Sequence, residues 1–335
     1  MKYSISLAAC LALFASPALA AGYTITPLVS DQAGVAQVQD PDLVNPWGLA
    51  QSFDGAPVWV SDNGTDKSTF YDRVTGNKQS PVVAVAGAPT GIVSVPSNVG
   101  FNVTKNGQSG HCSFAYDTES GLISCWAPSL DNFNAIVGYD GSAQKSAYKG
   151  IAIDTANQHL LTADFRNNRV QMIDTNWTEV GSFTDPSLPK NYAPFNVQVL
   201  GGKIYVAFAE RAKHSIDERA GKHRGYVDVF DLSGNLLTHL IANGKLNAPW
   251  GLAIAPSSFG EFANALLVGN FGDGKINAYD PNTGDFLGTL KGTNGKPLKI
   301  DGLWALDAGP GQSTVQFSAG PDDEAHGLLG SIKPN

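Results

Sequence analysis

The chain has 335 residues, with 22 Lys and Arg against 30 Asp and Glu, which gives a formal net charge of −8. Apolar residues make up 42% and charged residues 16% of it, a composition too apolar and too weakly charged for a disordered chain. The acidic balance argues against binding of nucleic acid through a basic surface. The 37 glycines and 10% aromatic residues favour an all-β fold with many tight turns.

The first twenty residues have the parts of a secretory signal peptide. Lys2 supplies a positive start, the stretch from Ile5 to Phe14 is apolar but too short to cross a membrane, and Ala18-Leu19-Ala20 fits the small-x-small cleavage pattern. No later segment approaches the roughly 18–20 apolar residues of a membrane helix. We therefore expect a signal peptide at 1–20, a single domain over 21–335, and export to the periplasm or the extracellular space.

Two cysteines remain in the mature chain, and the sequence predicts that they form a disulfide. Cys112 and Cys125 flank Asp117-Thr118-Glu119-Ser120-Gly121, which is typical of a hairpin turn. Folding the hairpin brings the two cysteines nearly opposite each other, and an exported protein favours their oxidation. A reactive dithiol is the alternative, although the Cys-x-x-Cys spacing is missing.

A short motif recurs along the mature chain. The segment from Asn45 to Ala50 returns almost unchanged from Asn247 to Ala253, and weaker copies lie between and after them. The glycine-equivalent positions of the six copies are 48, 91, 150, 196, 251 and 302. In each repeat a short apolar strand follows this position, a second strand ends in a polar pair, and a third ends in Tyr-Asp, Ile-Asp or Phe-Asp before a turn and a fourth strand.

Four strands in roughly 45–55 residues is the size of one propeller blade, so six repeats predict an all-β, six-bladed β-propeller with four-stranded antiparallel blades. The stretch from Tyr23 to Val29 is left over, and we expect this N-terminal strand to close the ring by joining the last blade, where it hides two free edges. Glycine lets the innermost strands approach one another at the axis. The Asp after each third strand is expected to accept backbone N–H bonds in its turn.

The repeat resembles the NHL type of six-bladed propeller. Nearly the whole mature chain is similar to a family of secreted bacterial NHL-like propellers, through Asp42 to Leu49, Ser61 to Thr65, Gly225 to Asp231, Val268 to Gly274 and Ala319 to Leu328. The resemblance implies the propeller fold and export, and it implies no reaction.

Blade topology predicts which loops share a face. The step before strand one and the loop between strands two and three emerge on the same side, the usual place for a ligand on a rigid propeller. The first position is held by Trp47, Thr90, Lys149, Phe195, Trp250 and Asp301. The second is held by Asp62, Asp164, Glu210, Asn270 and Asp322.

Acidic and amide side chains dominate these positions. They could hold a divalent cation such as calcium at the mouth of the channel, or they could be solvated turn residues. The candidate metal ligands are Asp62, Asp164, Asn270 and Asp301. The aromatic residues at the first position serve either as wedges between blades or as a platform for a ligand.

The longest polar insertion, residues 210–224, holds five Lys or Arg and two His in an otherwise acidic protein. It could form a positive lid over the acidic mouth and close on an anionic ligand, or it could be a mobile solvated loop. The candidate ligand-binding residues are Trp47, Trp250, Phe195, Arg211 and Arg166.

An acid-x-His step at Glu324-Ala325-His326 can supply a general base, although a hydrogen-bonded structural His is the alternative. The candidate catalytic residues are His326, Glu324, Lys149 and His214. The sequence contains no Gly-x-Ser-x-Gly elbow, His-Glu-x-x-His zinc motif, phosphate loop or Gly-x-Gly-x-x-Gly.

Two hypotheses remain open. The first is a secreted propeller, expected to be a monomer, that binds a small molecule, a glycan or a protein at the central mouth of its top face. The second is an extracellular metal-assisted hydrolase or lactonase, or a lyase, with its site at the same mouth. Fold alone does not decide between them.

Overall fold

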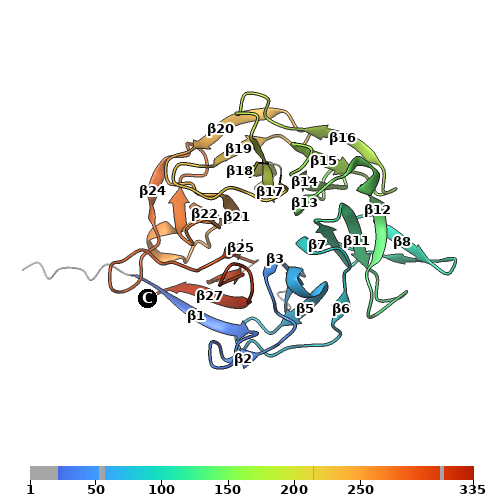
Figure 1. Ribbon diagram of the computed structural model, residues 1–335, viewed down its shortest axis with the longest axis horizontal. Coiled ribbons are helices and arrows are strands. Elements are labelled where there is room, and N and C mark those ends of the chain that lie inside the picture. The colour runs from blue at the N-terminus through green and yellow to red at the C-terminus, as the bar shows by residue number, and fades with distance from the viewer. Residues whose placement is uncertain (1–21, 53–56, 214, 310–312) are drawn as a thin grey trace, which may run out of the picture.

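The computed structural model describes residues 22–52, 57–213, 215–309 and 313–335, and the predicted signal peptide lies outside this range. Six antiparallel sheets stand around a central axis as a six-bladed β-propeller, as the sequence repeats predicted (Figure 1). The helical elements of the described residues are three short 3-10 turns, η1 (Asn63–Thr65), η2 (Ser142–Gln144) and η3 (Gly260–Phe262). No helix in this part of the chain is long and apolar enough to cross a membrane.

The first three blades follow one another in chain order, each from its innermost to its outermost strand. Blade 1 contains β3 (Pro46–Gln51), β4 (Val58–Asp62), β5 (Lys67–Tyr71) and β6 (Val83–Ala84). Blade 2 contains β7 (Pro89–Ser94), β10 (Phe114–Thr118), β11 (Leu122–Trp126) and β12 (Ile136–Asp140). A separate hairpin of β8 (Asn102–Lys105) and β9 (Gln108–His111) is inserted into this blade. Blade 3 contains β13 (Tyr148–Asp154), β14 (His159–Asp164), β15 (Arg169–Ile173) and β16 (Glu179–Phe183).

The remaining three blades complete the ring. Blade 4 contains β17 (Tyr192–Leu200), β18 (Lys203–Glu210), β19 (Tyr226–Phe230) and β20 (Leu236–Ala242). Blade 5 contains β21 (Pro249–Ile254), β22 (Leu266–Asn270), β23 (Ile276–Tyr279) and β24 (Phe286–Thr289). Blade 6 contains β25 (Leu303–Asp307), β26 (Val315–Ala319), β27 (Leu328–Pro334) and, from the other end of the chain, β1 (Tyr23–Ser30), with β2 (Val38–Gln39) parallel to β1 at its edge.

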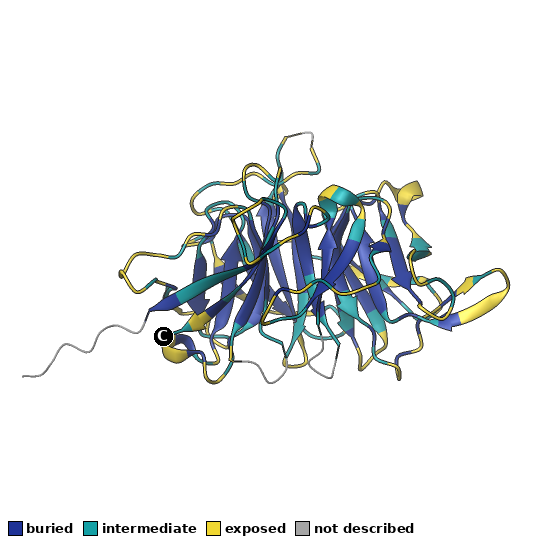
Figure 2. Cartoon of the chain, turned by 90° about the horizontal axis from the view of Figure 1, so that it is seen from below, coloured by how far each residue is buried: buried dark blue, intermediate teal, exposed yellow. Residues whose placement is uncertain are grey.

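The N-terminal strand closes the ring, as predicted. β1 pairs antiparallel with β27 along its whole length, from Tyr23 opposite Pro334 to Ser30 opposite Leu328. The pairing ties the first described residues to the last ones and covers the free edge of blade 6. Figure 2 shows the resulting distribution of burial, with buried strands through the middle of the disc and exposed residues in the loops of both faces.

Close packing of the innermost strands explains the glycines at the axis. A Cβ on Gly91 would lie 2.5 Å from the backbone nitrogen of Ile151 in the next blade, and a Cβ on Gly150 would lie 2.2 Å from Oδ1 of Asn196 in the blade after that. A side chain at either position would therefore force two blades apart.

Each innermost strand carries a break in its register with the second strand, at the same place in all six blades. Such a bulge re-aims the side chain that it carries. The six side chains at these breaks form what we call the central ring: Trp47, Thr90, Lys149, Phe195, Trp250 and Trp304.

The sixth repeat is shifted from its predicted register. Leu303 pairs with Ala319 and Leu306 with Phe317, so Trp304 occupies the position expected for Asp301, and Ala305 the position expected for Gly302. Gly302 instead has a φ of 62° in the turn before β25, where a Cβ would lie 2.0 Å from the carbonyl oxygen of Gly320. The repeated glycine therefore marked the turn in this blade and the bulge in the others.

Two local predictions are confirmed. Cys112 and Cys125 form a buried disulfide with a Cα–Cα distance of 5.4 Å, at the end of the β10–β11 hairpin away from its turn. The Asp after the third strand closes the following turn, as in Asp72, whose carboxylate accepts the backbone N–H of Val74 and of Thr75.

Candidate functional site

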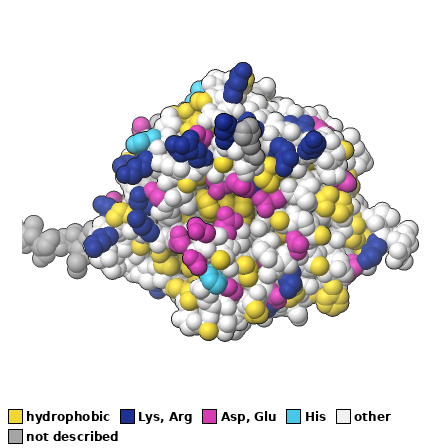
Figure 3. All heavy atoms as spheres, viewed as in Figure 1, with side chains coloured by type: hydrophobic (Ala, Val, Ile, Leu, Met, Phe, Trp, Pro, Cys, Tyr) yellow, Lys and Arg dark blue, Asp and Glu magenta, His cyan; other side chains and the backbone are white. Residues whose placement is uncertain are grey.

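The top face is defined by the loops between the second and third strands of each blade. Figure 3 shows this face: Asp and Glu side chains gather around the centre of the ring, and Lys and Arg side chains form an arc beside them. We call the acidic region at the centre of the ring the central mouth, and the cavity beside the Lys and Arg side chains the basic pocket.

Aromatic side chains plug the channel below the mouth. Trp47 stacks on Trp304 with a centroid distance of 3.5 Å, and Trp304 stacks on Phe271 at 4.1 Å. Trp250 and Phe195 meet Trp47 edge-on at 6.1 and 6.5 Å. Trp47 and Trp250 are only 2% and 3% exposed and Phe195 is fully buried, so these three predicted ligand-binding residues act as wedges between the blades.

Lys149 is the charged member of the central ring. Its side chain is 2% exposed, and its ammonium group forms an ion pair with Oε1 of Glu119 from the top loop of blade 2. The same nitrogen lies 3.9 Å from Oδ1 of Asp217 and 5.0 Å from the centre of the Trp47 ring. Burying an ammonium requires such partners, because an unpaired buried charge costs several kcal/mol.

Amide groups extend this network into blades 1 and 6. Asn45 donates from Nδ2 to Oε2 of Glu324 over 2.6 Å and accepts the indole N–H of Trp304 over 2.9 Å. Asn63 donates to Oε2 of Glu119 over 3.2 Å. Five blades thus contribute to one polar network at the mouth, which places the predicted residues Glu324 and Lys149 in a common electrostatic environment.

Two carboxyl groups of the mouth, those of Glu218 and Glu324, have a pKa above the ordinary value. Burial, together with the nearby charges of Glu324 and Asp217, raises the pKa of Glu218 to about 7, although Lys149 opposes the shift. Burial also raises the pKa of Glu324, against its hydrogen bond from Asn45 and the charge of Lys149. A carboxyl that titrates near neutral pH can donate and accept protons under physiological conditions.

The predicted insertion forms the basic pocket. Arg211 pairs with Glu218 in an antiparallel bridge, so residues 210–213 and 215–219 extend the β18–β19 hairpin above the face. Asp217 and Glu218 lie on its side toward the mouth. On the other side, a cavity of about 860 Å³ is lined by Arg166, Lys190, Asn191, Glu210, Arg211, Ala212, Lys213, Ser215 and Arg219.

The charges of this pocket are strongly unbalanced. Five of the lining side chains are cationic, and Glu210 is the single carboxylate among them. Glu210 already pairs with Arg219 at 3.2 Å and with Arg224 at 2.9 Å. Two of the predicted ligand-binding residues, Arg166 and Arg211, line this pocket, and Arg211 donates to the carbonyl oxygen of Arg166 over 3.0 Å.

Arg211 also donates to the carbonyl oxygen of Lys190 over 2.8 Å. It therefore joins the top loop of blade 3 to the segment that enters blade 4. Within the described residues, the side chains of Arg166, Lys190 and Lys213 are exposed and no ion pair or hydrogen bond engages them. These three groups are available to an anion.

The four predicted metal ligands lie in four different blades, and the structure does not bring them together. Each forms hydrogen bonds with groups in its own blade or in the segment that enters it. Asp62 accepts from Thr69, and Asp164 accepts from Ser146, Asn167 and Arg169. Asn270 donates to the carbonyl oxygen of Lys245, and Asp301 accepts the backbone N–H of Asp322. Polar side chains at the end of a second strand thus satisfy nearby loop groups first.

Among the described residues, the side chain of His326 bonds to Asp31 and not to the polar network around Lys149. Its Nδ1 is 2.8 Å from Oδ2 of Asp31, and Asp31 also accepts the backbone N–H of Gly327. These bonds tie the top loop of blade 6 to the segment that follows β1. This is the structural alternative considered for this residue. The other predicted histidine, His214, lies outside the described residues.

Several residues of the site were not anticipated. Glu119 was assigned to a hairpin turn, although it holds the blade 2 position equivalent to the top loops of the other blades. Trp304 was missed because of the shifted sixth repeat. Asp217 and Glu218 belong to the insertion, and no local pattern indicates that they reach the mouth.

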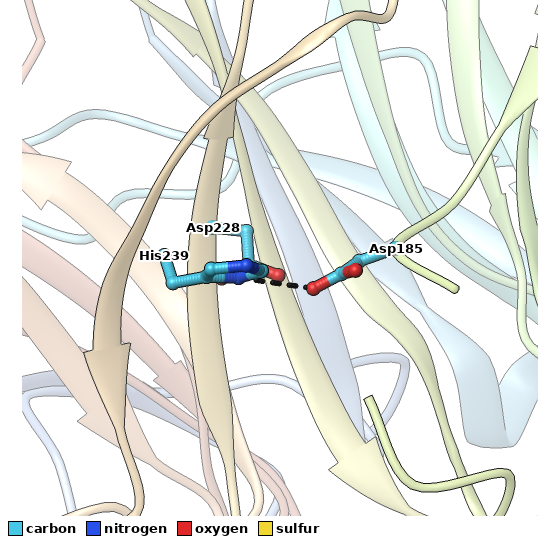
Figure 4. Close-up of side chains that lie close together, drawn as sticks. All are labelled: Asp185, Asp228 and His239. Atoms are coloured by element: carbon cyan, nitrogen blue, oxygen red, sulfur yellow. Dashed lines mark hydrogen bonds and ion pairs between the residues drawn. The ribbon is translucent and has the colours of Figure 1, made fainter. Parts of the chain in front are cut away.

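The described residues contain one group of three His, Cys, Asp or Glu whose ligand atoms all lie within 4.8 Å of one another: Asp185, Asp228 and His239 (Figure 4). This group could hold a metal ion. It lies between blades 3 and 4 and includes none of the predicted ligands.

Comparisons with known proteins identify relatives of this chain in a virus. It is 31% identical over 332 residues to uncharacterized protein L690 of Acanthamoeba polyphaga mimivirus, covering 93% of this chain and 86% of that protein. It is 30% identical over 327 residues to uncharacterized protein R648 of the same virus, covering 92% and 80%. The chain belongs to the family of these two proteins. No family model matches it.

Solved structures with the same fold include two enzymes. A streptogramin B lyase matches with a TM-score of 0.52 and 12% identity, over 93% of this chain and 98% of that one. A luciferin-regenerating enzyme matches with a TM-score of 0.58 and 13% identity, over 93% and 95%. These matches support the six-bladed fold. The viral relatives do not bear on the bacterial, NHL-like part of the predicted resemblance, which stays a prediction.

Proposed function

We propose that this protein binds a small molecule with two or more anionic groups in the basic pocket of its top face. The observation that carries the proposal is the charge of the pocket: five cationic side chains surround about 860 Å³, and their single carboxylate is already paired. A cavity of this size suits a small-molecule ligand. In a chain with a net charge of −8, five cations are held together against their mutual repulsion.

The chemistry of the pocket favours carboxylate or phosphate groups over a neutral sugar. Arg166 offers a planar guanidinium for a bidentate contact, and Lys190 and Lys213 offer point charges. The acidic mouth next to the pocket repels the same anion, so the ligand would be held on the side of blades 3 and 4. Exposed charges are screened by salt, so binding should weaken as the ionic strength rises.

Titration calorimetry with citrate and with inorganic pyrophosphate tests this proposal. We expect one of the two probes to bind with a stoichiometry of one per chain. Replacing Arg166 or Lys190 by Ala should weaken that binding by roughly 5- to 30-fold each, which corresponds to the loss of about 1–2 kcal/mol per charge-assisted contact. Lys203→Ala, at the opposite end of β18 in an exposed hairpin, is the matched control and should leave affinity unchanged.

Equal loss of affinity in all three variants would show general charge attraction, and no binding of either probe would contradict the proposal.

A second candidate function is acid–base catalysis at the central mouth, beside the basic pocket, by a lyase or a hydrolase. It is favoured by the position of Glu218, whose carboxyl has a pKa of about 7 and comes from the same segment as the pocket residues. Two propellers of this fold are enzymes by name, one of them a lyase, which is compatible with this candidate.

Mass spectrometry of products from a panel of anionic esters and lactones would test it. Turnover that is lost in Glu218→Gln while citrate or pyrophosphate still binds supports catalysis. Turnover unchanged in that variant, or absent in the wild type, contradicts it.

A further inference from the structure

The seam between blades 3 and 4 contains a second group of ionisable side chains. Asp228 lies in β19 and His239 lies directly opposite it in β20, since the two residues are register partners. Asp185 comes from the segment between β16 and β17, which carries the chain from blade 3 into blade 4. Figure 4 shows the two carboxylates and the imidazole ring facing one another.

The distances within this group suit a small metal ion. Nδ1 of His239 lies 3.0 Å from Oδ2 of Asp185 and 3.3 Å from Oδ1 of Asp228. Metal–ligand bonds of 2.0–2.2 Å in a tetrahedral arrangement place neighbouring ligand atoms roughly 3.3–3.6 Å apart. Small movements of side chains would therefore complete three bonds to one ion.

The two buried carboxylates give this group an excess of negative charge, which a bound cation would balance. The side chain of Asp185 is 1% exposed and that of Asp228 is 0% exposed, and these two buried carboxylates face one imidazole. No Lys or Arg of the described chain pairs with either carboxylate, and Oδ2 of Asp228 has no hydrogen-bond partner there. A divalent ion bound to two carboxylates and a neutral imidazole gives a site with no net charge, which removes the cost of burying an unpaired charge.

We propose that Asp185, Asp228 and His239 form a binding site for a zinc-type divalent transition metal ion, which joins blade 3 to blade 4. The imidazole ligand and the small number of ligands favour such an ion over calcium, which takes six to eight oxygen ligands. The side chain of His239 is 50% exposed, so the fourth coordination position opens toward solvent and water can fill it. The alternative occupant of the site is a proton shared by the carboxylates.

Binding of Zn²⁺ to the untagged, chelator-treated chain tests this proposal. We expect one Zn²⁺ per chain, a rise of several degrees in the melting temperature, and a visible absorption band typical of tetrahedral coordination when Co²⁺ replaces Zn²⁺. His239→Gln should abolish all three effects and should fold, because its side chain is half exposed. Asp185→Asn provides a second variant in which the shape of a buried ligand is kept.

The matched control is His111→Gln, which removes a histidine from the β8–β9 hairpin and should bind Zn²⁺ as the wild type does. Zn²⁺ binding that persists with unchanged stoichiometry in His239→Gln and Asp185→Asn would overturn the proposal. So would the absence of a thermal shift with Zn²⁺, or a larger shift with Ca²⁺. The basic pocket plays no part in these readouts.

Discussion

Replacing Lys149 by Met removes the buried ammonium group of the mouth while keeping a side chain of similar length. Glu119 loses its ion-pair partner, and the carboxylates of Glu119, Asp217, Glu218 and Glu324 then share the mouth with no cation from the central ring. Removing one partner of a buried ion pair costs roughly 3–5 kcal/mol. Glu119 is 24% exposed, so water recovers part of this loss, and we expect about 3 kcal/mol near pH 8.

The loss should depend on pH in a defined direction. Lys149 lowers the pKa of Glu218 and of Glu324, so both pKa values lie higher in the folded variant than in the folded wild type. A carboxyl whose pKa is raised by folding contributes stability that is full below its unfolded pKa and is lost as the pH rises through its folded pKa. The deficit of the variant therefore grows as the pH rises from about 5 to about 8.

Thermal melting at these two pH values measures the effect. A loss of about 3 kcal/mol corresponds to a fall of roughly 6 °C for a chain of this size. Adding Glu119→Gln to Lys149→Met should restore part of the stability at the higher pH, because the uncompensated carboxylate is removed as well. A deficit that is equal at both pH values, or a double variant no more stable than the single one, would refute this electrostatic description of the mouth.

Two further predictions concern the scaffold. Replacing both Cys112 and Cys125 by Ala should lower the free energy of unfolding by about 3 kcal/mol, which is the loop-closure entropy for a sequence separation of 13. The melting temperature of this double variant should equal that of the wild type measured under reducing conditions. Gly91→Ala should lower the free energy of unfolding by about 2–3 kcal/mol, the usual size of an overpacking loss, because the new Cβ would lie 2.5 Å from the backbone nitrogen of Ile151. Gly181→Ala in β16, where the nearest atom is 3.7 Å away, is its control in the same melting assay, and an equal loss in both variants would contradict the close packing at the axis.

The fold could be predicted because its determinants repeat along the chain. Five of the six blades have a small residue where the innermost strands meet, and four have an Asp that closes the turn after the third strand; both are visible as local patterns. The register of the sixth repeat was predicted wrongly because Ala305 occupies the position that glycine holds in other blades. Alanine is small enough there, so the nearby Gly302 was taken for the repeat.

The mouth could be predicted only in part, because its contacts join loops from different blades. Topology places Lys149 on the top face, but the sequence gives no sign that Glu119 would reach it. The end of each second strand was correctly placed in a top loop. Metal ligands were expected at these positions, whereas Asp164 and Asn270 form hydrogen bonds with the loop that enters their own blade. Local backbone groups are nearer than any partner across the channel, and they engage these side chains first.

The residues of the basic pocket could be predicted only in part. Arg166 and Arg211 were identified from charge in the top loops, and Lys190 was not, because it lies outside the second-to-third strand loops. Its position becomes clear only when the segment that enters blade 4 is seen to border the pocket.

Anomalous diffraction from a crystal soaked in selenate tests anion binding in the basic pocket, because it locates a bound anion without assuming the ligand. We expect a selenate ion in the basic pocket, within hydrogen-bond distance of at least two of the side chains of Arg166, Lys190 and Lys213, and its loss from crystals of Arg166→Ala. Selenate ions scattered over other surface lysines, with the basic pocket empty, would show that the pocket is not an anion site.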